Sequence, residues 1–135
     1  MKSIIAIGII LIGFLTSCDA QKTNNSEANG VITKDVTPAE FKELINSNEG
    51  ILLDVRTPEE VAEAKINGSV NLNIYDSNFE AEINKLDKNK TVYVYCKSGG
   101  RSRNAKDLKK TMGFTKIYNL DGGITSWKSE GFETK

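Results

Sequence analysis

Histidine is absent from this chain of 135 residues. Its absence excludes a histidine-based catalytic triad, a histidine metal ligand and a histidine proton shuttle within the chain. Charge of either sign is not in excess, because lysine plus arginine and aspartate plus glutamate both number 18. A balanced chain does not build the positive field that attracts nucleic acid, so no nucleic-acid partner is expected.

Cysteine is scarce, and Cys18 and Cys96 are the only two in the sequence. No CxxC pair or other ligand cluster with metal spacing is present, so no metal and no other cofactor is expected. Cys18 ends an apolar segment that has its own explanation below, which leaves Cys96 unpaired. An unpaired cysteine in an exported chain is either a core residue or a reactive thiol. The glycines Gly99 and Gly100 that follow Cys96 favour the reactive thiol.

Residues 1–17 have the pattern of an export signal, with Lys2 followed by an apolar run from Ile4 to Leu15. The run is too short to span a bilayer comfortably as a helix. Its end, Leu15-Thr16-Ser17-Cys18, resembles the lipobox of bacterial lipoproteins, in which the cysteine is acylated and becomes the mature amino terminus. An ordinary signal peptide or an uncleaved anchor are the alternatives. Because Cys18 stands where hydrophobicity ends, a lipoprotein is predicted, held by its lipid on a membrane of the bacterial cell envelope at the periplasmic or outer-surface face.

Residues 18–30 are predicted to be the acylated cysteine and a flexible tether, and residues 31–135 a single domain. Residues 19–30 contain no large apolar side chain and cannot bury enough surface to become ordered. Beyond them, apolar strand patterns alternate with helix patterns. Strands are expected at Val31–Ile32, Ile51–Val55, Gly68–Leu72, Thr91–Tyr95 and Lys116–Leu120. Helices are expected after capping boxes at Thr37–Glu40 and Thr57–Glu60, across Phe79–Leu86, over Ser102–Met112 and from Ile124. This alternation predicts an α/β domain with a central parallel sheet of about five strands and helices on both faces.

Cys96 comes directly after a buried strand, and a helix begins only a few residues later. That position is the usual ligand crevice of an open α/β sheet. Unpaired N–H groups at the start of the helix and in the Gly99-Gly100 turn favour an anion there. The pKa of a thiol among such donors falls below its ordinary value, and Lys97 and Arg101 add positive charge. The loop suits a nucleophilic sulfur or an anion bound above it.

The segment Cys96-Lys97-Ser98-Gly99-Gly100-Arg101-Ser102 resembles the active-site loop of rhodanese-type sulfurtransferases. The resemblance extends to Leu53–Glu60, Ile66–Leu72 and Leu120–Trp127, in the family's order, and covers about residues 31–134. One stretch departs from the family pattern. Ala64 and Lys65 stand where a glycine–histidine pair is usual, and Asn67 stands where proline is frequent.

The resemblance implies a rhodanese-like fold and a sulfurtransferase of the thiosulfate type, in which Cys96 carries a persulfide. The partners would be a small anionic sulfur donor, such as thiosulfate or polysulfide, and a thiol-type acceptor. The rest of the loop would bind the anion: Lys97, Ser98, Gly99, Gly100, Arg101 and Ser102. Asp54 and Arg56 are interpreted as a supporting polar pair that braces a turn rather than as catalytic residues.

Two other readings of the loop remain open. Cysteine phosphatases and arsenate reductases also place a cysteine and an arginine around an anion, but their loops have five residues between the two, and four separate Cys96 from Arg101. A non-catalytic binding or redox-sensing module is the second, although inactive relatives typically lack the cysteine. Arg101 itself is predicted either to orient the loop, by pairing with a carboxylate, or to contact the substrate.

Overall fold

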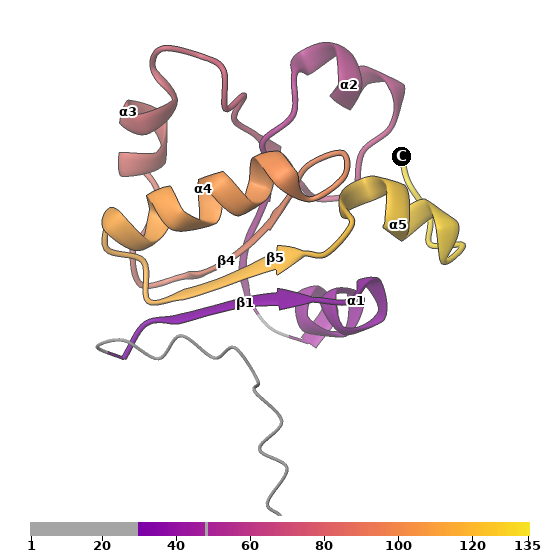
Figure 1. Cartoon of the computed structure of the whole chain (residues 1–135), viewed down its shortest axis with the longest axis horizontal. Coiled ribbons are helices and arrows are strands. Elements are labelled where there is room, and N and C mark those ends of the chain that lie inside the picture. Colours follow the sequence, from indigo (N-terminus) through magenta and orange to yellow (C-terminus); the bar gives the residue numbers. More distant parts are fainter. Residues whose placement is uncertain (1–29, 48) are drawn as a thin grey trace, which may run out of the picture.

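The computed structural model of the protein describes residues 30–47 and 49–135 (Figure 1). The predicted leader, the lipidation site Cys18 and the tether up to residue 29 lie outside the described residues. The described part alternates strands and helices, as the sequence predicts. The elements are β1 (Ile32–Val36), α1 (Pro38–Ser47), β2 (Gly50–Asp54), α2 (Pro58–Glu63), β3 (Val70–Asn71), α3 (Phe79–Asn84), β4 (Thr91–Tyr95), α4 (Gly100–Thr111), β5 (Lys116–Leu120) and α5 (Gly123–Ser129).

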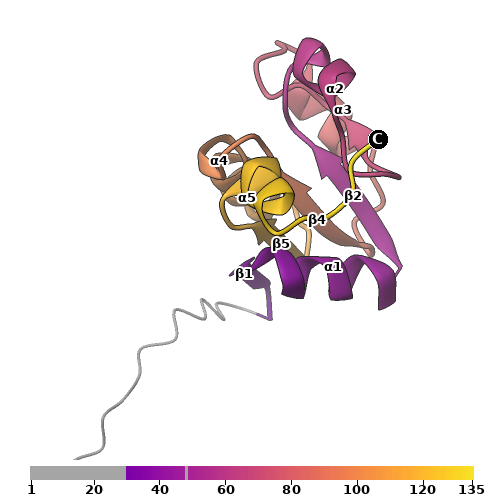
Figure 2. The same ribbon diagram turned by 90° about the vertical axis from the view of Figure 1, so that its right-hand side faces the viewer.

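All strand pairs in the sheet are parallel, and the strand order is β1-β5-β4-β2-β3. The predicted parallel α/β sheet is therefore confirmed. Side chains alternate across the central strand β4. Val92 and Val94 pack in one core with α3 and α4, and Tyr93 and Tyr95 pack in a second core with α1 and α5. Figure 2 shows α1 and α4 on opposite sides of the sheet. Helices thus cover both faces.

Three local features differ from the expectations. β3 is limited to Val70–Asn71, because Gly68 adopts a positive φ of 84° and the Ser69 N–H donates to the Ile66 carbonyl in a turn that precedes the strand. The helix α4 begins at Gly100 rather than Ser102. At the start of α1, the capping-box residue Glu40 pairs with a lysine: its carboxylate accepts a bond of 2.7 Å from Lys34 Nζ. At the start of α2, by contrast, the capping box between Thr57 and Glu60 is complete.

Among the described residues, no helix has both the length and the apolar character that crossing a membrane requires.

Asp54 and Arg56 form a buried ion pair at the carboxyl end of β2. Arg56 Nη2 lies 2.6 Å from Asp54 Oδ2, and the two side chains are 4% and 0% exposed. The Arg56 guanidinium also donates to the carbonyls of Glu60 and Ala64. The pair therefore joins the end of β2 to carbonyls near both ends of α2.

We expect Asp54→Ala to lower the free energy of unfolding by about 3–5 kcal/mol, because it leaves the Arg56 charge buried without its partner. Urea unfolding followed by circular dichroism measures the change. Glu82→Ala is the matched control, since it breaks a pair with Lys85 whose side chain is 69% exposed, and it should cost less than about 1 kcal/mol. Equal losses in the two variants would show that Asp54 does not brace the fold.

Candidate active site

The loop after β4 aims hydrogen-bond donors at the sulfur of Cys96. The Gly99 N–H donates to Cys96 Sγ over an N···S distance of 2.9 Å. This direction of the amide depends on a positive φ of 98° at Gly99, a conformation that residues with a Cβ rarely adopt. A Cβ at Gly99 would also lie 3.2 Å from the backbone nitrogen of Gly122. Glycine is therefore required here for both conformation and space.

Ser102, in the first turn of α4, supplies a second donor to the sulfur. Its Oγ lies 3.4 Å from Cys96 Sγ and 3.2 Å from the Gly99 carbonyl oxygen, and the Ser102 side chain is buried. A hydroxyl has one proton to donate, so the two acceptors compete for it. A thiolate accepts more strongly than a neutral carbonyl, so ionisation of Cys96 draws the proton to sulfur.

These donors outweigh the cost of burying the thiolate. Burial by itself raises the pKa of Cys96. The hydrogen bonds from the Ser102 hydroxyl and from the backbone N–H groups of Ser102, Gly99 and Ser98 together lower this pKa by more than burial raises it. The net result is a pKa below the ordinary value for a thiol. This shift favours the thiolate form, which a nucleophilic sulfur needs.

The sulfur lies beneath the loop rather than at its surface. Cys96 is 0% exposed and packs on one side against buried side chains of the α3–α4 core, while the donors lie on the other side. Above it, Lys97, Ser98 and Gly100 are exposed. A Cβ added to Gly100 would meet no atom within 4 Å. The loop must move to admit a donor, and its solvent side has the room to do so.

The first residues of α5 hold the Cys96 loop in place through hydrogen bonds to its backbone carbonyls. The Ile124 N–H donates to the Cys96 carbonyl over 2.9 Å and the Thr125 N–H donates to the Lys97 carbonyl over 3.1 Å. A Cβ on Gly123 would lie 2.5 Å from both carbonyl oxygens. The sequence identifies Gly122 and Gly123 only as a turn. Their pairing with the Cys96 loop was missed, although two glycines side by side are a signal of close backbone approach.

Arg101 does not point freely into solution. Its Nη1 and Nη2 atoms each lie 2.6 Å from one carboxylate oxygen of Glu60, and its guanidinium carbon lies 5.9 Å from the centre of the Tyr75 ring. The hydrogen bond from Arg101 lowers the pKa of Glu60 to about 2. The carboxylate pairing considered for Arg101 is thus present. Glu60 was identified from sequence only as part of a capping box.

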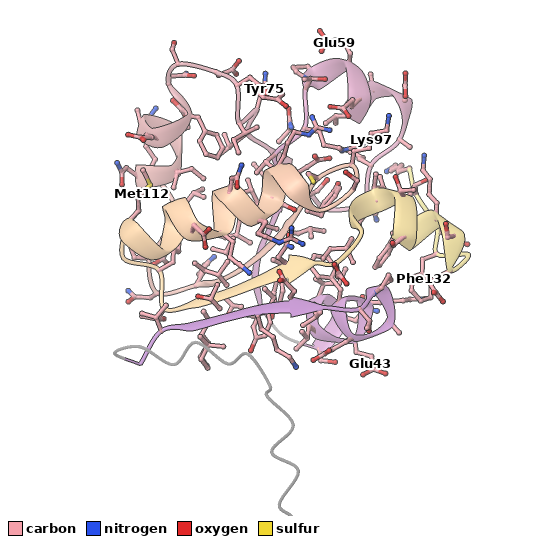
Figure 3. The ribbon with its side chains drawn as sticks, in the orientation of Figure 1. Glu43, Glu59, Tyr75, Lys97, Met112 and Phe132 are labelled. Atoms are coloured by element: carbon pink, nitrogen blue, oxygen red, sulfur yellow. The ribbon has the colours of Figure 1, made fainter. Side chains whose placement is uncertain are left out.

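Lys97 lies at the edge of a pocket of about 90 Å³ between α2 and α5. In Figure 3 Tyr75 lies above the amino-terminal end of α4, and Lys97 lies to the right of that end, by the loop that precedes the helix. Arg56 also lines this pocket, while Asp54 lies behind it, bonded to Arg56. Neither Asp54 nor Arg56 forms a described hydrogen bond with Cys96. Over residues 30–47 and 49–135, no three His, Cys, Asp or Glu side chains are grouped to hold a metal ion.

We expect Ser102→Ala to raise the pKa of the Cys96 thiol, because the variant loses a donor to the thiolate. The pH dependence of Cys96 alkylation by iodoacetamide measures this shift, and its midpoint should move to higher pH. Ser98→Ala is the matched control, because alanine keeps the backbone N–H that acts on the sulfur and removes only an exposed hydroxyl. A midpoint unchanged in Ser102→Ala would mean that the hydroxyl serves only the Gly99 carbonyl.

Comparison with known proteins adds independent information. Residues 37–130 match the family model described as "Rhodanese-like domain". A protein of Allochromatium vinosum named "Sulfurtransferase" is 31% identical over 88 residues, which cover 65% of this chain and 80% of that protein. A Bacillus subtilis protein named as a sulfur carrier is 33% identical over 104 residues; the match covers 76% of this chain but only 55% of that protein. The crystal structure of a rhodanese-related protein from Thermoplasma volcanium has a TM-score of 0.68 and 30% identity, covering 76% of this chain and 97% of that chain.

Proposed function

The chain belongs to the rhodanese-like domain family, two of its relatives are named as a sulfur carrier and a sulfurtransferase, and from that premise we propose that it transfers sulfane sulfur through a persulfide on Cys96. The donor is a small sulfane compound such as thiosulfate or polysulfide, and the acceptor is a thiol or another thiophilic nucleophile. The observation that carries the proposal is the Gly99 N–H, 2.9 Å from Cys96 Sγ at the end of a parallel strand.

In the first step, the Cys96 thiolate attacks the outer sulfur of thiosulfate. A bond forms between Sγ and that sulfur, and the bond between the two sulfurs of thiosulfate breaks. The electron pair leaves with sulfite. The product on the protein is a persulfide anion, so the step needs no proton, no oxidant and no metal. A lowered pKa at Cys96 supplies the thiolate without a general base, in agreement with a chain that contains no histidine.

In the second step, an acceptor thiolate attacks the outer sulfur of the persulfide. The bond within the persulfide breaks, and its electron pair returns to Cys96 as the thiolate. The donors stabilise the Cys96 thiolate at the start and at the end of this cycle: the N–H groups of Ser98, Gly99 and Ser102 and the Ser102 hydroxyl. Splitting one transfer into two displacements is covalent catalysis, and donors placed in advance lower the cost of the developing charge.

One feature favours sulfur over phosphate as the group that the loop handles. The ring between Cys96 and Arg101 is one residue shorter than a phosphatase loop and leaves less room for a tetrahedral oxyanion over the sulfur. A redox-sensing module is the other alternative, and it would not keep a stable extra sulfur on Cys96.

We expect the domain of residues 31–135, after treatment with thiosulfate or polysulfide, to gain the mass of sulfur on Cys96, and Cys96→Ser to gain none. Intact-mass spectrometry before and after addition of an acceptor thiol measures loading and release. A parallel assay with an aryl phosphate should show no turnover. Faster phosphate hydrolysis than sulfur transfer, or no added sulfur from any donor, would contradict the proposal.

We also propose that a lipid on Cys18 anchors the protein to a membrane of the bacterial cell envelope. The support is the sequence alone, an apolar run that ends in Leu15-Thr16-Ser17-Cys18. Two or more acyl chains on one residue give stable anchoring, whereas one chain binds only marginally.

We expect the full chain, expressed in a bacterium, to partition into the detergent phase of a Triton X-114 extraction and to incorporate labelled fatty acid. Cys18→Ser should incorporate none, because it lacks the acylated sulfur, while Cys96→Ser should behave as the wild type. Equal labelling of Cys18→Ser and wild type would contradict lipidation at this residue.

A further inference from the structure

The carboxylate of Glu60 serves two parts of the molecule at once. Within α2 it accepts bonds of 3.2 Å from the backbone N–H and the hydroxyl of Thr57. Across a separation of 41 residues it accepts two bonds of 2.6 Å from Arg101. The first set belongs to the capping box that the sequence reveals. The second set joins α2 to the first turn of α4, where the Cys96 loop ends.

The capping bonds make Glu60 a fixed anchor for Arg101. Because Thr57 holds the carboxylate at the start of α2, the Arg101 guanidinium cannot rotate away without losing both of its bonds. The pairing is end-on, through Nη1 and Nη2, and leaves the Nε–H of Arg101 unused by Glu60. The Tyr75 ring lies 5.9 Å from the guanidinium carbon and limits its movement further.

We propose that Glu60 is a positioning residue for sulfur loading: it holds the Arg101 guanidinium beside the Cys96 loop, where its remaining N–H groups are available to an anionic donor. The inference rests on the proposed sulfur transfer and adds to it the residue that controls use of charged donors. Glu60 need not touch the donor. It acts by fixing the geometry of a group that does, and preorganised charge of this kind favours binding and the transition state.

The pair is partly open to solvent. The Arg101 and Glu60 side chains are 22% and 25% exposed, so solvent screens part of what the pair contributes to folding. The pKa of Glu60, lowered to about 2, keeps the carboxylate charged at neutral pH. The Glu60–Arg101 charge pair is therefore present at that pH.

The first test compares Glu60→Gln with Glu59→Gln in persulfide formation from thiosulfate. Glutamine at position 60 keeps an oxygen for the capping box but loses the charge and one of the two bonds to Arg101. Glu59 belongs to the same first turn of α2 and points away from the loop in Figure 3, so its substitution makes the same charge change without the pair.

We expect kcat/KM to fall about tenfold in Glu60→Gln, mainly through KM, and to stay within about twofold in Glu59→Gln. A rise in Glu60→Gln would show that the carboxylate competes with the donor, and equal values in both variants would show that the pair is idle; either result overturns the proposal.

The second test asks whether Glu60 acts through Arg101. We expect Arg101→Ala to lower kcat/KM at least as much as Glu60→Gln, and the double variant to be no slower than Arg101→Ala. If Glu60→Gln causes the same loss with and without Arg101, Glu60 acts by another route and the proposal fails.

Alkylation of Cys96 by iodoacetamide at fixed pH separates this proposal from the proposed function, because it requires no sulfur transfer. If the wild type gained no sulfur from any donor, that result would refute the proposed sulfur transfer but not the positioning of Arg101 by Glu60. In that case Glu60→Gln and Arg101→Ala should still be alkylated more slowly than the wild type, since the held guanidinium favours the thiolate. The double variant should be alkylated no more slowly than Arg101→Ala. Wild-type alkylation in Glu60→Gln together with slow alkylation in Arg101→Ala would refute the positioning role.

Discussion

The whole site depends on hydrogen-bond donors that converge on one buried sulfur. A thiolate buried without partners is strongly disfavoured, and the apolar core beneath Cys96 would by itself keep the thiol protonated. The Gly99 N–H at 2.9 Å and the Ser102 hydroxyl at 3.4 Å reverse that preference. The same donors suit a persulfide, whose terminal sulfur is also anionic. Stabilisation of one kind of charge therefore serves both the free and the loaded protein.

The sheet explains why the donors can be held so closely. Cys96 follows β4, the central strand, whose side chains are buried on both faces between two layers of helices. The loop cannot sink, because the core is beneath it. It also cannot lift as a whole, because the start of α5 binds the carbonyls of Cys96 and Lys97. The Glu60–Arg101 pair then joins the far end of the loop to α2. The start of α5 thus fixes the beginning of the loop and α2 fixes its end, and only the solvent side of the loop is open.

The sequence predicts the fold well because its signals are local. Apolar runs such as Thr91–Tyr95 and the capping box at Thr57 determine elements by nearest-neighbour chemistry, and parallel pairing follows from their alternation. The predicted bounds of β3 were wrong because Gly68 lies in a turn, although the residues that follow it have the pattern of a strand. Cys96 and its loop could be chosen from the strand–turn–helix order alone. The contacts that hold the loop could not: Glu60 meets Arg101 over 41 residues, and the adjacent glycines Gly122 and Gly123 signal a close backbone approach without indicating that Cys96 is the partner.

The central claim is that the fold holds Cys96 as a thiolate, and a direct pH titration of that thiolate tests it most simply. The ultraviolet absorbance of the thiolate in the domain of residues 31–135, with Cys96→Ser subtracted, reports the charge on this sulfur without any substrate. The account predicts a midpoint clearly below about 8.5, the value of an ordinary thiol. A midpoint at or above that value would mean that burial outweighs the donors, and the persulfide mechanism would lose its physical basis.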